Sequence, residues 1–153
     1  MHPILNFTDL TAHLQQLGRR FRLSIVCGSD DSTAGAAMRA VNMGFAEAIF
    51  VGDCDAVRRQ PCVAEYQGNH VSFVEADTHE SAAQQAVMLV REGKADVLMK
   101  GLLHTETLLR AVLNKEWGIL PKGRVLTHIA VAQIPAYHKL LFSVSYTHLT
   151  LPT

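Results

Sequence analysis

The sequence has no surplus of positive or negative charge, and its composition argues against two classes of protein. Fourteen Lys and Arg residues balance fourteen Asp and Glu residues, so the formal net charge is zero. A nucleic-acid-binding protein needs a basic surplus to neutralise phosphates, and we therefore expect no nucleic-acid partner. With 48% hydrophobic and 18% charged residues, the 153-residue chain also differs from a disordered protein.

Long apolar runs and disulfide-forming cysteines are scarce as well. The longest apolar run, near residues 129–134, is interrupted by Gln133 and is far shorter than the roughly 18 residues of a membrane span. No charged segment followed by an apolar segment opens the chain, so we expect no secretory signal. Cys27, Cys54 and Cys62 have the spacing of neither a disulfide framework nor a zinc site. We therefore expect a cytoplasmic protein without a membrane partner and without a metal.

Strand patterns and helix patterns alternate along most of the chain. Strands are expected at residues 22–27, 46–51, 70–75, 95–99 and 124–134, with a short apolar run at 140–142. Helices are expected at residues 7–17, 34–43, 55–59, 81–91 and 105–115. This alternation predicts an α/β fold, with three layers formed by a mainly parallel sheet and helices on both of its faces.

Polar residues before two of these helices indicate where the helices begin. Thr8 or Asp9 is expected to cap the first helix. Asp77 and Glu80 have the spacing of a capping box before the helix at residues 81–91.

The glycine-rich turn at residues 28–35 follows the first expected strand of the α/β pattern. Such a turn before a helix can hold an anion on backbone N–H groups. The turn matches neither nucleotide-binding fingerprint, and Asp30 and Asp31 would repel a phosphate. The favoured interpretation is that Asp or Ser caps the helix.

A stronger candidate site begins at Lys100, at the carboxyl end of an expected strand, where ligands collect in open α/β sheets. Gly101 permits a close approach to the backbone, and His104 and Thr105 fall at the start of the next helix, which favours an anion. Arg110 lies off the apolar stripe of that helix. These residues form either an oxyanion pocket or an ordinary surface with a helix cap, and their spacing alone favours neither.

Thr127 and His128 form a polar pair on the expected strand at residues 124–134. A lone histidine on a strand is more often structural than functional, so this pair is a candidate only because of the Lys100 segment.

Residues 95–142 resemble the phosphate acetyltransferase and phosphate butyryltransferase family, and are more similar to its butyryl branch. That branch has a Leu-Met-Lys-Gly stretch like residues 98–101, then a His-Thr pair, a helix with Leu-Arg, and a Ser-His or Thr-His strand. Residues 22–53 carry a weaker resemblance to the same family.

The resemblance implies a reversible transfer of an acyl group between coenzyme A and inorganic phosphate. It implies that Lys100 and Arg110 contact phosphate, and that Gly101, His104 and Thr105 shape the phosphate pocket. Thr127 and His128 match the polar strand pair of the family. Coenzyme A and phosphate are then substrates, no cofactor is bound permanently, and the complete protein is a homo-oligomer.

Family members are about twice as long as this chain, with two domains of the architecture found in isocitrate and isopropylmalate dehydrogenases. Their aspartate base, serine and arginine lie in a returning segment that this sequence does not contain. We therefore interpret residues 1–142 as the incomplete N-terminal α/β domain of such an enzyme, inactive by itself. Residues 143–153 resemble a translated DNA-sequencing adapter and are interpreted as non-native.

Two alternative functions remain open at this point. A non-catalytic α/β ligand-binding module would bind phosphate or coenzyme A without turnover. A metal-dependent decarboxylating dehydrogenase of related architecture would need a carboxylate cluster and an arginine-rich substrate motif, and the sequence has neither. The sequence does not determine the length of the acyl chain.

Overall fold

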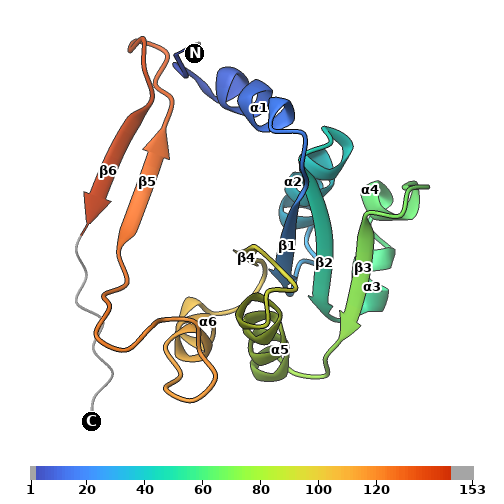
Figure 1. Cartoon of the computed structure of the whole chain (residues 1–153). Coiled ribbons are helices and arrows are strands. Elements are labelled where there is room, and N and C mark those ends of the chain that lie inside the picture. Colours follow the sequence, from blue (N-terminus) through green and yellow to red (C-terminus); the bar gives the residue numbers. More distant parts are fainter. Residues whose placement is uncertain (1–2, 146–153) are drawn as a thin grey trace. The chain divides into compact units, whose positions relative to one another are not determined.

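The computed structural model describes residues 3–145 and contains alternating strands and helices through the middle of the chain (Figure 1). The elements are α1 (Phe7–Gln16), β1 (Phe21–Val26), α2 (Asp31–Asn42), β2 (Ala46–Gly52), α3 (Cys54–Arg58), α4 (Pro61–Ala64), β3 (Val71–Glu75), α5 (His79–Arg91), β4 (Val97–Lys100), α6 (Thr105–Val112), β5 (His128–Ala132) and β6 (Leu141–Ser145). The expected α/β fold with a parallel sheet is confirmed.

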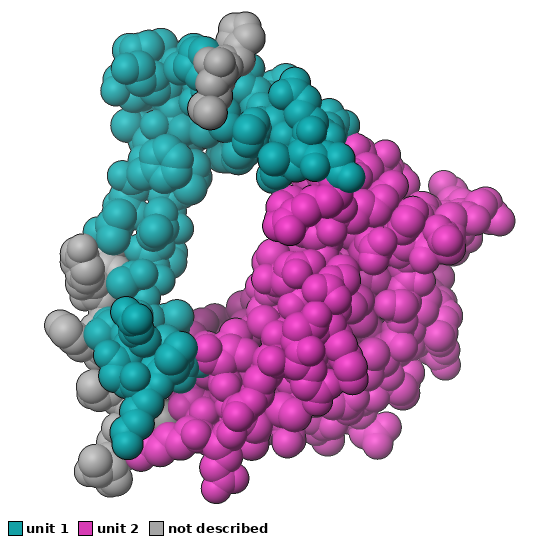
Figure 2. All heavy atoms as spheres, in the orientation of Figure 1, with its two compact units in different colours: residues 1–18, 120–153 teal, residues 19–119 magenta. Residues whose placement is uncertain are grey.

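The described residues divide into two compact units, which Figure 2 shows in different colours. The larger unit comprises residues 19–119 and holds the parallel sheet. The smaller unit comprises residues up to 18 together with the chain from residue 120 onward, and holds α1, β5 and β6. Each unit is described here by itself.

The sheet of the larger unit has four parallel strands in the order β3-β2-β1-β4. Its central strand, β1, pairs along its whole length with β2, from Phe21 opposite Ala46 to Val26 opposite Val51. On its other edge β1 pairs with β4, and Val26 lies opposite Lys100. This register brings the carboxyl ends of β1 and β4 to the same edge of the sheet.

Alternating side chains of the central strands enter two separate hydrophobic cores. Ile25 and Phe50 point to one face, where they pack with buried residues of α2, α3 and α4. Val26 and Val51 point to the other face, where they pack with the small residues of α5 and with α6. The larger unit therefore has three layers, with helices on both faces of the sheet, as the alternating pattern predicts.

The helices begin at residues that differ from the expected caps. Asn6 caps α1 by accepting a hydrogen bond from the Asp9 backbone, so the expected cap at Thr8 or Asp9 is wrong. Thr78 caps α5 by accepting from the Ser81 backbone, so the expected capping box of Asp77 and Glu80 is also wrong. In both cases another polar residue within three positions of the expected cap, with the same capping chemistry, holds the position.

The smaller unit contains an antiparallel hairpin in place of the expected long strand at residues 124–134. Only residues 128–132 are extended as β5, and they pair with β6 from His128 opposite Ser145 to Ala132 opposite Leu141. Within this unit the Phe7 backbone donates a 2.9 Å hydrogen bond to Gln133 Oε1. Most of the adapter-like segment, residues 146–153, lies outside the described residues.

Candidate functional site

The candidate site lies where the direction of the strand order changes. From β1 the chain passes through α2 to β2 on one side, and it later returns through α5 to β4 on the other side of β1. The helices that follow β1 and β4 cover opposite faces of the sheet, because α2 packs in one core and α6 in the other. In open α/β sheets such a switch point is where ligands bind, outside the carboxyl ends of the strands.

Two backbone hydrogen bonds hold the connections after β1 and β4 side by side. The Gly101 N–H donates to the Val26 carbonyl and the Leu102 N–H donates to the Cys27 carbonyl, each at 2.8 Å. A Cβ atom on Gly101 would lie 2.4 Å from the Cys27 carbonyl oxygen. The close approach expected at Gly101 is present, and the group that approaches is the backbone of the neighbouring strand.

The backbone is strained where β1 ends. Cys27 has a φ of 51°, a left-handed conformation that is rare for residues other than glycine, and it is the single described non-glycine residue with positive φ. Strained conformations of this kind concentrate at functional sites. Burial raises the pKa of the Cys27 thiol, which disfavours the thiolate form that a nucleophile needs. Cys27 therefore contributes the shape of the turn.

Lys100 is the last residue of β4 and its side chain is exposed at this edge of the sheet. Its ammonium group donates a 3.2 Å hydrogen bond to the carbonyl oxygen of Gly101. The ammonium has three N–H donors, so this contact leaves donors for other acceptors. The position expected for Lys100, at the carboxyl end of a strand, is the position that the structure gives.

Asp30 faces the charge of Lys100 from the connection after β1. Asp30 caps α2, because its Oδ2 atom accepts a 2.9 Å hydrogen bond from the Thr33 backbone. Partial burial acts to raise the pKa of Asp30. The hydrogen bonds at Thr33 and the charge of Lys100 together lower the pKa by more than burial raises it, so the pKa lies below its ordinary value. The favoured interpretation of residues 28–35 as a capped turn is thus confirmed for Asp30.

The electrostatic influence of Lys100 on Asp30 was not foreseen from the sequence, which placed the two residues in separate candidate sites. A signal was present, however. Lys100 ends β4 and Asp30 follows the end of β1 by a few positions, and the carboxyl ends of adjacent parallel strands meet at one sheet edge. What the sequence alone does not show is that β4 is adjacent to β1.

His104 and Thr105 lie at the start of α6, as expected. His104 occupies the capping position without a capping hydrogen bond from its side chain, and Thr105 is the first helical residue. Both side chains are exposed. They are therefore accessible at the end of the connection that begins with Lys100.

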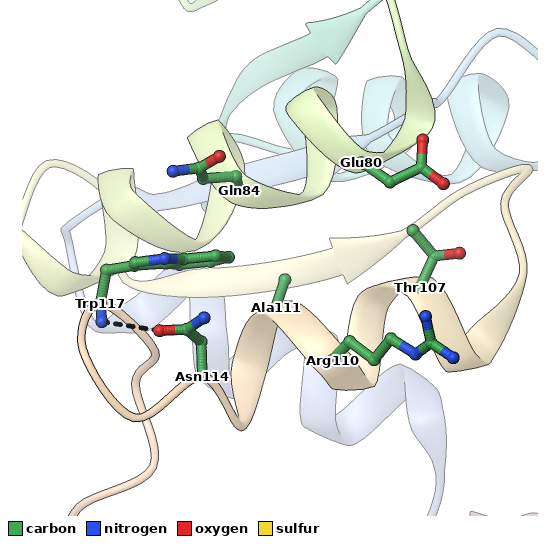
Figure 3. A pocket seen from close by; sticks show the side chains of 7 residues that line it. All are labelled: Glu80, Gln84, Thr107, Arg110, Ala111, Asn114 and Trp117. Atoms are coloured by element: carbon green, nitrogen blue, oxygen red, sulfur yellow. Dashed lines mark hydrogen bonds between the residues drawn. The ribbon is translucent and has the colours of Figure 1, made fainter.

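Arg110 lines a different hollow, between α5 and α6 (Figure 3). This groove of about 220 Å³ is lined by Glu80, Gln84, Thr107, Arg110, Ala111, Asn114 and Trp117. The Arg110 guanidinium donates a 2.5 Å hydrogen bond to Glu106, and both side chains are about three-quarters exposed. The residues that line this groove do not include Lys100, Gly101, His104 or Thr105.

Thr127 and His128 belong to the smaller unit. His128 is the first residue of β5, and Thr127 directly precedes it. Both side chains are exposed.

Residues 3–145 contain neither a cluster of metal-binding side chains nor a membrane-spanning helix. No group of three or more His, Cys, Asp or Glu side chains within this range is arranged to hold a metal ion. No helix in the same range is long and apolar enough to cross a membrane.

Comparisons with known proteins were made for sequence and for structure. No family model matches the chain. A phosphate butyryltransferase of Clostridium acetobutylicum is 36% identical over 131 residues, which are 86% of this chain and 43% of that protein. The phosphate butyryltransferase of Clostridium beijerinckii is 31% identical over 147 residues, or 96% of this chain and 48% of that protein. A phosphate acetyltransferase of Rhizobium meliloti is 30% identical over 113 residues, covering 74% of this chain and 35% of that protein.

A solved structure gives the same answer for the fold. The branched-chain phosphotransacylase from Enterococcus faecalis V583 superposes with a TM-score of 0.62 and 25% sequence identity, over 81% of this chain and 42% of that one. The fold and the matches thus show that this chain is similar to phosphate acyltransferases over most of its own length. More particularly, the resemblance to the phosphate acetyltransferase and phosphate butyryltransferase family is confirmed over most of the chain. The chain spans a little less than half the length of the two phosphate butyryltransferases described above.

Proposed function

We propose that this chain is part of an enzyme that reversibly transfers an acyl group, of acetyl or butyryl size, between coenzyme A and inorganic phosphate. The observation that carries the proposal is the 36% identity to a phosphate butyryltransferase across 86% of the chain. The exposed ammonium of Lys100 at the switch point of the sheet supports it, because a cation there suits an anionic substrate.

The proposed roles are given in the order of the residues along the chain. Lys100 contacts phosphate, and Gly101, His104 and Thr105 shape the pocket around it. Arg110 contacts phosphate as well, and its accessible guanidinium would have to exchange Glu106 for the substrate. Positive groups of this kind stabilise the charge that develops during acyl transfer. Thr127 and His128 contribute a polar pair from the smaller unit.

The remaining features of the proposal concern the complete enzyme. Coenzyme A and phosphate are substrates, no cofactor is held permanently, and no metal takes part. The enzyme is a cytoplasmic homo-oligomer with two domains arranged as in isocitrate and isopropylmalate dehydrogenases. Residues 1–142 form an incomplete first domain, residues 143–153 are non-native, and the catalytic aspartate lies in a segment outside this sequence.

Binding of inorganic phosphate to the 153-residue chain tests the role of Lys100. Ligand-observed ³¹P NMR is expected to detect binding that the substitution Lys100→Met weakens about tenfold or more, the size of one charge-assisted contact. The matched control is Lys115→Met, because Lys115 is an exposed lysine of the same unit. Equal binding by both variants would contradict a phosphate site at Lys100.

Turnover is the second readout of the same proposal. Because the residues that act on the thiol are assigned to a segment outside this sequence, the 153-residue chain is expected to release no coenzyme A from butyryl-CoA in the presence of phosphate. Turnover by this chain would refute that assignment. A longer chain, read from the genomic sequence after the codon for Phe142, is expected to restore the release.

A further inference from the structure

One oxygen of Asp30 has no hydrogen-bond partner although it is buried. Oδ2 accepts from the Thr33 backbone, whereas Oδ1 is shielded from solvent and accepts from no group. It is the single side-chain atom in this condition among residues 3–145. A buried acceptor without a donor costs free energy, so such an atom calls for an explanation.

The positive group that acts on this carboxylate is Lys100. After the hydrogen bonds at Thr33, the charge of Lys100 is the smallest of the causes that lower the pKa of Asp30. The backbone bonds from Gly101 to Val26 and from Leu102 to Cys27 bring the two connections together, which explains why the charges interact. No direct ion pair joins the two side chains within 4.0 Å among the described residues; the Lys100 ammonium donates to Gly101 instead.

We propose that Asp30 is a positioning residue that orients the Lys100 ammonium toward phosphate. This inference rests on the proposed phosphate contact of Lys100. The ammonium has three donors on a flexible stem. One donor bonds the Gly101 carbonyl. In the proposed arrangement the second donor bonds Asp30 Oδ1 after the lysine side chain rotates, and the third is then directed at a phosphate oxygen. Two fixed acceptors restrict the rotation of a group that would otherwise sample many directions.

Two other roles of Asp30 must be separated from this one. Asp30 caps α2, so its loss destabilises a helix whatever happens at Lys100. Its negative charge also repels an anion, and by that effect alone its removal would tighten phosphate binding. Positioning predicts the opposite sign, because without Asp30 the ammonium is no longer oriented.

The substitution Asp30→Asn separates the three roles, since asparagine caps helices as well as aspartate does but carries no charge. In Asn the amide oxygen keeps the capping bond from the Thr33 backbone, and the remaining NH₂ group is a donor that cannot accept from the ammonium. We expect D30N to weaken phosphate binding about fivefold to tenfold in the ³¹P NMR titration, with an unchanged melting temperature. Asp30→Ser, which also keeps a capping side chain, is expected to behave alike. Asp31→Asn removes the same charge from the adjacent exposed residue and is expected to cause no loss.

Each other outcome overturns the proposal. Tighter phosphate binding by D30N would show that Asp30 acts on the anion by repulsion. Unchanged binding would show that Asp30 does not orient the ammonium. Weakening confined to Asp30→Ala, which removes the cap, would show a structural role only. If K100M weakens binding and D30N does not, the positioning role fails while the phosphate site stands. If K100M has no effect, the proposed site itself fails.

Discussion

Gly101 shows how little space a single residue leaves at the candidate site. The hydrogen of Gly101 faces the carbonyl groups of Val26 and Cys27, where a Cβ atom would lie 2.5 Å and 2.4 Å from their oxygens. Because both obstacles are backbone atoms, no side chain can turn away to make room. The close contact between the connections after β1 and β4 therefore depends on glycine at this position.

The substitution Gly101→Ala is expected to destabilise the chain by about 1–3 kcal/mol, the usual cost of forcing an atom into a packed region. Urea unfolding followed by circular dichroism measures this change. The matched control is Gly35→Ala within α2, where the added Cβ meets only the Arg39 guanidinium at 3.5 Å. That control is expected to stabilise the helix by about 0.5–1 kcal/mol. Equal effects of the two substitutions would show that the close approach at Gly101 is not rigid.

Among the elements, β4 is one of the two edge strands of the sheet and is fixed at its start by an ion pair. Arg22 at the beginning of β1 bonds both carboxylate oxygens of Asp96, with its Nε and Nη2 atoms at 3.0 Å and 2.9 Å. The Arg22 backbone donates to the same carboxylate at 2.9 Å. Hydrogen bonds from Arg22 lower the pKa of Asp96 to about 2. These contacts hold the first residues of β4 beside β1, at the opposite end of β4 from Lys100.

This ion pair gives the chain an acid-sensitive step. A carboxyl group with a pKa lowered on folding stabilises the folded state above its unfolded value of 3.8, and this contribution is lost as the pH falls toward about 2. Asp96→Asn is therefore expected to flatten the pH dependence of the free energy of unfolding between about pH 4 and pH 2.

The control is Asp55→Asn, which removes a carboxylate from an exposed pair with Arg58 inside one helix. It is expected to keep the slope of the original chain. A slope that stays the same in Asp96→Asn would mean that the ion pair does not contribute to stability in solution.

The elements with strong periodicity were predictable, and short elements were not. The central strands lie close to the expected ranges, because their apolar runs enter a core on both faces of the sheet. The helix α5 also lies close to its expected range, and its buried residues enter one of these cores. The four-residue helix α4 was missed, because Pro61 at its first turn reads equally well as a turn. The expected strand at residues 124–134 is shortened to β5, whose pairing partner β6 determines its length.

The positions of site residues that depend on local sequence were predictable, whereas neighbours that come together from different strands or helices were not. Lys100, His104 and Thr105 take the expected positions because a strand end and a helix start fix them locally. The neighbourhood of Asp30 and Lys100 depends on strand order, which no local pattern encodes. The same holds for Arg110, whose groove is formed by a partner helix, α5.

At the scale of the whole molecule, the two units differ in how much apolar surface they bury. The larger unit contains both hydrophobic cores. In the smaller unit every residue of β5 is exposed, and Ile129 and Phe142 are 57% and 67% accessible. A two-stranded hairpin without a covering layer is only marginally stable in water.

We therefore expect the amides of β5 and β6 to lose protection from hydrogen exchange long before those of β1 and β2. Exchange followed by mass spectrometry measures both groups in the same sample, so the central strands serve as an internal control. Comparable protection of the hairpin and the central strands would contradict this order. It would indicate that the apolar residues of the hairpin are covered in solution.

The alternation of Ile25 and Val26 in β1 has a consequence for how this gene can vary. These two residues are neighbours in sequence, yet they belong to different cores on opposite faces of the sheet. A single inserted or deleted codon upstream in the strand would exchange their faces and disrupt both cores at once. Conservative replacements at either position disturb one core only. Variation in this segment should thus consist of substitutions, with the length of the strand held constant.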